Sequence, residues 1–172
     1  STWQVFAAPG HDTHSVVLFE PKQRLLISAD ALWANGFGVV FPELEGLDAF
    51  AEVSSTLDLI QSLDAKVVYP GHGSAFTDVG AAIDRARRRL DQFVSHPEKH
   101  QAYGTKVLLK FKLMEFQSLP LDDFLAWAVQ TPYLQLMHHQ KELDISSWVL
   151  SFVQQLVASG AARMDGAVLS NL

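Results

Sequence analysis

Apolar and polar positions follow two different patterns along the first hundred residues. Four short apolar runs, rich in β-branched residues and mostly stopped by proline, predict strands at 4–7, 15–20, 25–28 and 65–69. Apolar residues three and four apart predict amphipathic helices over 48–63 and 78–94. Only four residues separate the second run from the third, which favours a hairpin. Because strands and helices alternate, this part is predicted to be α/β.

The later part of the chain reads as mainly helical. Apolar spacing and capping residues predict helices over 106–117, 121–130 and 146–159, and a further one that begins at Thr131-Pro132. The chain then places Asp165-Gly166 between two short apolar runs, which is a strong local signal for a hairpin. Helices followed by a two-stranded wing give the outline of a winged-helix domain.

This change of pattern predicts a domain boundary near residues 96–104. We therefore assign 1–97 to an α/β domain and 98–172 to a small, mainly helical, winged-helix-like domain. His96 and His100 fall in the expected linker and are predicted to be solvated.

The amino-acid composition of the chain excludes or disfavours several classes of protein. The chain has 172 residues, 48% of them hydrophobic and 19% charged, which is typical of a folded globular protein. Its net charge of −6 makes nucleic acid an unlikely partner, and without cysteine there is no disulfide, thiolate ligand or Cys nucleophile. No apolar run is long enough to span a membrane, and the first residues lack the features of a signal peptide. We expect a cytoplasmic protein.

Three residues of metal-ligand type stand where a predicted strand gives way to a loop. His11 lies in the polar loop 9–15, Asp30 directly follows the third apolar run, and His72 lies between Gly71 and Gly73. Functional groups gather at strand ends in α/β proteins, and His with Asp suits zinc, iron or manganese. Taken singly, a histidine in a turn is more often a surface residue, and an aspartate after a strand is more often a cap. The flanking glycines strengthen the case for His72 because they permit close backbone approach.

In order and spacing these segments resemble the C-terminal half of the metallo-β-lactamase superfamily. Pro9-Gly10-His11 is similar to the family's Pro-Gly-His-Thr turn, Ser28-Ala29-Asp30-Ala31-Leu32 to its Ser/Thr-Gly-Asp segment, and Tyr69-Pro70-Gly71-His72-Gly73 to its Pro-Gly-His-Gly turn. The resemblance covers residues 3 to about 95 and implies half of an αββα sandwich. Residues 33–46 would form the active-site loop, and the helical part resembles the winged-helix-like domain of some members.

The resemblance implies a metal-dependent hydrolase. His11 would bind the first of two divalent metals, Asp30 would bridge them as the catalytic carboxylate, and His72 would bind the second. Zinc is the expected metal, with iron or manganese as alternatives. An activated water would then attack an ester, thioester, lactam or phosphodiester in a small-molecule substrate.

Two departures from the family pattern change this expectation. The family's His-x-His-x-Asp-His motif is absent and would lie in an N-terminal half upstream, so the chain is expected to be a fragment that is inactive alone. Asp12-Thr13-His14 replaces the usual sequence after the first histidine, which leaves His14 open as an extra ligand, a supporting residue or a surface side chain. The apolar strands also predict an uncovered inner sheet face, which would bind the missing half or form a homodimer.

The alternative is a nucleic-acid- or protein-binding module that uses the winged-helix-like domain. A nucleic-acid reader should carry basic residues on its third helix, and 146–159 contains neither Lys nor Arg. The sequence therefore favours the enzyme.

Overall fold

The computed structural model describes residues 2–139 and 142–172 and divides the chain into two compact units. The first unit is Ser1–His100 and the second is Gln101–Leu172, where the sequence suggested 1–97 and 98–172. Each unit is described by itself.

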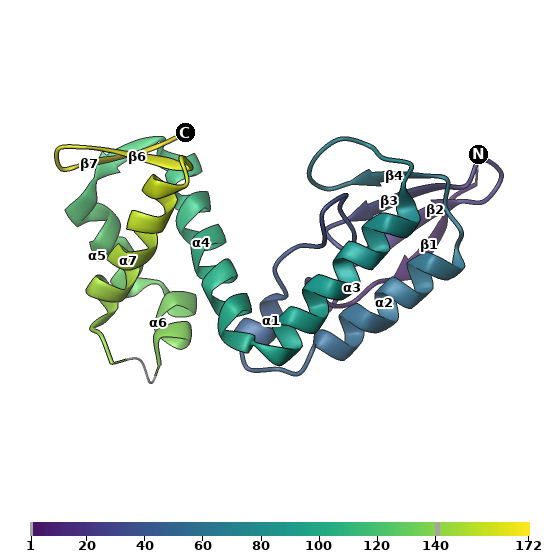
Figure 1. Cartoon of the computed structure of the whole chain (residues 1–172), viewed down its shortest axis with the longest axis horizontal. Helices are drawn as coiled ribbons and strands as arrows, with labels where there is room; N and C mark the ends of the chain where they lie inside the picture. Colours follow the sequence, from purple (N-terminus) through teal and green to yellow (C-terminus); the bar gives the residue numbers. More distant parts are fainter. Residues whose placement is uncertain (1, 140–141) are drawn as a thin grey trace. The chain divides into compact units, whose positions relative to one another are not determined.

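A four-stranded sheet forms the centre of the first unit (Figure 1). Its strands lie in chain order: β1 (Gln4–Ala7), β2 (Val16–Glu20), β3 (Leu25–Ala29) and β4 (Val67–Pro70). The first three are antiparallel, which confirms the expected hairpin, and β4 is parallel to β3. The parallel pair requires a crossover, and the long segment between β3 and β4 supplies it.

Helices α2 (Phe50–Ser62) and α3 (Val79–Ser95) cover one face of this sheet, and the short α1 (Phe41–Leu44) precedes them (Figure 1). The alternate strand residues that face these helices form the core with the apolar stripes of α2 and α3. Fully buried members include Val17, Leu26, Val68, Leu57, Ile60 and Ala86. Burial of each large apolar side chain stabilises the fold by about 1.5–3 kcal/mol.

The opposite face of the sheet carries apolar side chains that are largely exposed. Val5, Leu18, Ile27 and Tyr69 are direct cross-strand neighbours and form one row across all four strands. Val5 is 66% exposed, Ile27 38% and Tyr69 46%. The apolar runs in the sequence thus place hydrophobic residues on both faces, and the helices of this unit cover only one.

The second unit packs helices against a small sheet. Its elements are α4 (Pro97–Phe116, which begins in the first unit), β5 (Ser118–Pro120), α5 (Leu121–Gln130), α6 (Pro132–His138), α7 (Ile145–Ala158), β6 (Ala162–Asp165) and β7 (Val168–Asn171). Asp144 caps α7 by accepting a hydrogen bond from the backbone N–H of Ser147 at 3.1 Å. Hydrogen bonds from the Ser147 side chain and backbone hold the pKa of Asp144 below its ordinary value. This cap starts the helix one residue before the expected position.

Three sequence predictions for this region were incomplete or wrong. The predicted hairpin has a third strand beside it, β5, so the sheet order is β5-β7-β6. The expected linker is helical, because α4 runs without a break from Pro97. His100 is not solvated: it is 2% exposed, and its ring meets Phe50 and Phe93 edge-on.

None of the described helices combines the length and the apolar character needed to cross a membrane.

Candidate metal centre

Three loops that follow strands meet at one end of the first unit's sheet. Strands β1 and β3 are both antiparallel to β2, so they run in the same direction, and β4 is parallel to β3. Their C-terminal ends therefore lie together. His11 follows β1, Asp30 directly follows β3, and His72 follows β4.

The backbone turns sharply where it presents Asp30. The register between β3 and β4 shifts between Ile27 and Ala29, and Ala29 has a φ of 46°. The hydroxyl of Ser28, which is fully buried, donates a hydrogen bond to the carbonyl oxygen of Leu32 at 2.6 Å. The bulge and the buried hydroxyl aim the carboxylate out of the end of the sheet.

Each oxygen of the Asp30 carboxylate faces a different histidine. Nε2 of His11 lies 3.4 Å from Oδ2, and Nε2 of His72 lies 3.7 Å from Oδ1. The structure therefore brings the three candidate ligands together. Their role as metal ligands stays a prediction.

His11 is anchored from behind by the loop that follows Asp30. Its Nδ1 lies 2.7 Å from the carbonyl oxygen of Val39, and its ring packs edge-on against Phe41 at 5.3 Å between centroids. Since a carbonyl oxygen only accepts hydrogen bonds, Nδ1 carries the proton. In the neutral ring, Nε2 then turns a lone pair toward Asp30.

This arrangement fits a cation between the two side chains. An imidazole lone pair and a carboxylate oxygen are both acceptors, so a cation bound between them would stabilise their approach to 3.4 Å. A histidine that donates its other N–H to a carbonyl is also the usual form of a metal-binding histidine. Across the described residues, no group of three or more His, Asp or Glu side chains is placed to hold a single ion.

Two glycines let the backbone approach these side chains closely. A Cβ on Gly71 would lie 2.7 Å from Oδ1 of Asp30, and one on Gly38 would lie 2.8 Å from Nδ1 of His11. Hydrogen bonds hold both segments in place, from Gly71 N–H to the oxygen of Ala29 at 2.8 Å and from Gly38 N–H to the oxygen of Asp30 at 2.9 Å. The glycine beside His72 thus has the close approach that the sequence suggested, and Asp30 is what it approaches.

Asp12 organises the loop that carries His11. Its carboxylate accepts hydrogen bonds from the backbone N–H of His14 at 2.7 Å and from the Ser15 hydroxyl at 2.9 Å. Burial raises the pKa of Asp12, but these two bonds and the charges of His11 and His14 together hold it below its ordinary value. His14 contacts this loop through its backbone N–H, and the role of its side chain stays open.

Trp33 contacts this centre and was not singled out from the sequence. Its indole N–H donates a hydrogen bond to Oδ1 of Asp30 at 3.1 Å, and its ring meets the His72 ring edge-on with centroids 5.1 Å apart. The sequence analysis placed it only as the first residue of the expected active-site loop 33–46 and gave it no role of its own.

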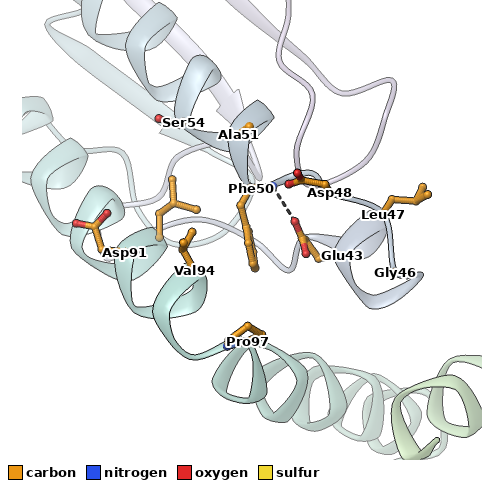
Figure 2. Close-up of a pocket in the computed structure, with 11 residues that line it drawn as sticks. Glu43, Gly46, Leu47, Asp48, Phe50, Ala51, Ser54, Asp91, Val94 and Pro97 are labelled. Atoms are coloured by element: carbon orange, nitrogen blue, oxygen red, sulfur yellow. Dashed lines mark hydrogen bonds between the residues drawn. The ribbon is translucent and has the colours of Figure 1, made fainter.

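A hollow of about 610 Å³ opens elsewhere on the first unit, as Figure 2 shows. Apolar side chains such as Phe50 and Val94 line it together with the carboxylates of Glu43, Asp48 and Asp91. The Glu43 carboxylate accepts hydrogen bonds from the N–H groups of Ala49 and Phe50 at the start of α2. None of the three candidate ligands lines this hollow. Its size alone does not identify it as a substrate site.

Comparison with known proteins finds similarity to the superfamily that the sequence resembles. Residues 1–72 match the sequence profile described as the metallo-beta-lactamase superfamily. This part of the chain is similar to the metallo-β-lactamase superfamily. The matched residues include His11 and Asp30 and end at His72.

Two curated proteins illustrate the similarity to this superfamily. The chain is 29% identical over 108 residues to the beta-lactamase-like protein 2 homolog of Caenorhabditis elegans, covering 63% of this chain and 32% of that protein. It is 32% identical over 90 residues to the probable metallo-hydrolase YqjP of Bacillus subtilis, covering 48% of this chain and 28% of that protein. The aligned part of the chain thus spans about a third of the length of these relatives.

A solved structure also aligns with the chain. A beta-lactamase domain protein from Burkholderia ambifaria is 18% identical, with coverage of 99% of this chain and 48% of that chain and a TM-score of 0.43.

Proposed function

We propose that the chain is part of a metal-dependent hydrolase that cleaves an ester, thioester, lactam or phosphodiester in a small-molecule substrate. The observation that carries the proposal is the Asp30 carboxylate with one imidazole beside each oxygen. The match of residues 1–72 to the metallo-β-lactamase superfamily supports the hydrolase class. Among the curated relatives, one is itself described as a probable metallo-hydrolase.

In this proposal each of the three residues has a distinct task. His11 and His72 would each hold one divalent metal through Nε2, and Asp30 would bridge both through its two oxygens. When bound, the metals supply Lewis-acid activation of the water and of the scissile group. Val39 keeps His11 in the tautomer that can bind a metal, and the bulge at Ala29 keeps Asp30 at the end of the sheet. Zinc suits this donor set best, and iron or manganese are also compatible.

The described residues supply too few ligands for a complete centre. Zinc usually takes three protein ligands in a catalytic site, and each proposed metal would receive only one imidazole and one carboxylate oxygen here. We therefore propose that the remaining ligands come from a further half-domain and that the chain alone is inactive. The relatives, of which the aligned part spans about a third, are long enough to contain such a half.

The exposed row on the sheet supports an associated partner. Val5, Leu18, Ile27 and Tyr69 form an apolar surface that the unit's own helices do not cover. In a longer protein the other half-domain would cover this surface. In the chain alone, we propose that a second copy covers it and forms a symmetric dimer.

The alternative function, a binding module built on the second unit, has little support. Helix α7 contains no basic residue, and Nζ of Lys110 is held by the carbonyl oxygens of Ala161 and Leu172 at 2.5 and 2.7 Å. Neither feature suits contact with phosphates. The winged-helix character of this unit and the cytoplasmic location stay predictions.

Metal binding by the chain tests the proposal directly. Calorimetric titration with Zn²⁺ should show binding that Asp30→Asn abolishes and that Asp84→Asn, an exposed carboxylate on α3, leaves unchanged. Because the ligand set is incomplete, we expect weak affinity and no turnover of ester, thioester, lactam or phosphodiester model substrates. Zinc binding that is equal in both variants would show that Asp30 is not a ligand.

A further inference from the structure

Trp33 contacts both groups on the His72 side of the centre. Its indole N–H donates to Oδ1 of Asp30, at 3.1 Å. The same oxygen is the one that faces Nε2 of His72, at 3.7 Å. The Trp33 ring meets the His72 ring edge-on, with centroids 5.1 Å apart and planes at 76°. One indole therefore touches the oxygen and the imidazole between which the second metal would lie.

A tight turn holds Trp33 in this place. The N–H of Ala31 donates to the oxygen of Ser28 at 3.0 Å, and the N–H of Trp33 donates to the oxygen of Gly36 at 2.6 Å. The N–H of Gly36 returns a hydrogen bond to the oxygen of Trp33 at 3.4 Å. These bonds fix the backbone of Trp33, and the hydrogen bond from its indole N–H to Asp30 holds the side chain.

The two histidines are supported unequally. The ring of His11 is fixed through Nδ1 by the carbonyl oxygen of Val39. The side chain of His72 is 63% exposed, and its contacts in the described part of the chain are those with Asp30 and Trp33. The orientation of His72 therefore depends on Trp33 in a way that the orientation of His11 does not.

We propose that Trp33 is a positioning residue for the metal on the His72 side. Its N–H fixes the direction of Oδ1, and its ring limits the rotation of the His72 imidazole. A carboxylate oxygen has two lone pairs, so Oδ1 can accept the indole proton with one and bind a cation with the other. The inference rests on the proposed function, because it requires a metal between Asp30 and His72.

Trp33→Phe should weaken metal binding on the His72 side and leave binding on the His11 side nearly unchanged. Phenylalanine keeps an aromatic ring in the turn but has no N–H to donate. Loss of a hydrogen bond that orients a metal ligand typically weakens metal binding by 10- to 100-fold. We expect a loss of about 10-fold on the His72 side and less than twofold on the His11 side.

The experiment titrates the whole chain with Zn²⁺ and follows the ring C–H resonances of its histidines by NMR. The variants His11→Gln and His72→Gln identify the two signals, and Trp3→Phe, a partly exposed tryptophan outside the centre, is the matched control. Wild type and Trp3→Phe should show the same two binding curves. In Trp33→Phe, only the His72 curve should move to higher zinc concentration.

The possible outcomes distinguish this inference from the proposed function. If neither histidine signal of the wild type responds to zinc, the proposed function fails and this inference fails with it. If both respond but Trp33→Phe leaves the His72 curve unchanged, or moves both curves equally, only the inference is wrong.

A second measurement uses only the wild-type protein, so it does not depend on whether a variant folds. The indole N–H signal of Trp33 in the wild type should shift with zinc along the same curve as His72. An indole signal that stays fixed while His72 titrates would contradict the inference.

Discussion

The carbonyl oxygen of Val39 accepts a hydrogen bond from Nδ1 of His11 across 28 residues of sequence. This bond decides which nitrogen of His11 faces Asp30 and keeps the ring from rotating. His72 has no such anchor in the described part of the chain, and its side chain is more exposed than that of His11, at 63% against 24%. The two proposed metal positions are therefore unequal before any metal binds.

The first prediction concerns the difference in zinc affinity between the His11 and His72 positions. His72→Gln, which keeps the anchored His11, should retain tighter zinc binding than His11→Gln, because an ordered ring loses less conformational entropy on binding. Ordering a mobile side chain costs roughly 1 kcal/mol, or about a fivefold difference in dissociation constant. Calorimetric titration of both variants measures the difference, and equal constants would show that the Val39 anchor has no effect on metal binding.

The second prediction concerns the close approach of Gly71 to Asp30. Gly71→Ala would place a Cβ 2.7 Å from Oδ1 and 3.1 Å from the carbonyl carbon of Ala29, so the carboxylate must move. We expect a stability loss of about 1–3 kcal/mol and weaker zinc binding. Gly80→Ala is the matched control, since nothing lies within 4 Å of its Cβ and its position in α3 should favour alanine by up to about 1 kcal/mol. Chemical denaturation and zinc titration of both variants check this prediction, and a Gly71→Ala variant with wild-type zinc affinity would contradict the close contact.

The third prediction follows from the buried His100. Burial, with a smaller contribution from the charge of Arg89, lowers the pKa of His100 from 6.5 to about 4. Its Nε2 accepts a hydrogen bond from the N–H of Val40 at 3.1 Å, which also requires the neutral ring. Below pH 6.5 the unfolded chain binds a proton that the folded chain does not bind until about pH 4. This residue therefore lowers the free energy of unfolding by roughly 3 kcal/mol as the pH falls from 6.5 to 4.

His100→Gln tests that pH dependence, since glutamine can also accept the Val40 N–H but does not titrate. Denaturation curves measured between pH 7 and pH 4 should show a smaller decline for the variant than for the wild type. Parallel declines would mean that His100 takes up its proton in the folded chain at an ordinary pH.

The fourth prediction concerns the exposed face of the sheet. Ile27→Glu places a charge in the middle of the apolar row and should weaken self-association, because the charge would be desolvated at the dimer interface. Val94→Glu introduces the same charge at an exposed apolar position on α3, away from the sheet, and should leave association unchanged. Light scattering over a range of concentrations measures both, and a wild type that stays monomeric throughout would contradict the proposed dimer.

Local patterns in the sequence predicted most elements of the fold because their causes are local. The apolar runs of β2 and β3, the spacing in α2 and α3, and the Asp165-Gly166 turn each specify structure within a few residues. Strand β5 was missed because Ser118-Leu119-Pro120 offers one apolar side chain, and its pairing with β7 joins residues about fifty positions apart.

The candidate ligands were found in the sequence for a similar reason, since each is flanked by a recognisable turn. The residues that support them were placed only as part of the expected active-site loop 33–46, without roles of their own. Val39 acts through a backbone carbonyl, which any residue could supply, and Trp33 acts through a turn that brings its ring back over Asp30. His100 was misread because the α4 start at Pro97 and the interior Gly104 resemble a linker, while its partners Phe50 and Phe93 are distant in sequence.

The central claim is that Asp30 bridges two metal positions, one beside each histidine. Anomalous diffraction from crystals of the chain soaked in zinc, recorded on both sides of the zinc absorption edge, tests it most directly. We predict two peaks, one between Nε2 of His11 and Oδ2 of Asp30 and the other between Nε2 of His72 and Oδ1. Saturating zinc that gives no peak beside Asp30, or a single peak bound by neither histidine, would contradict the claim.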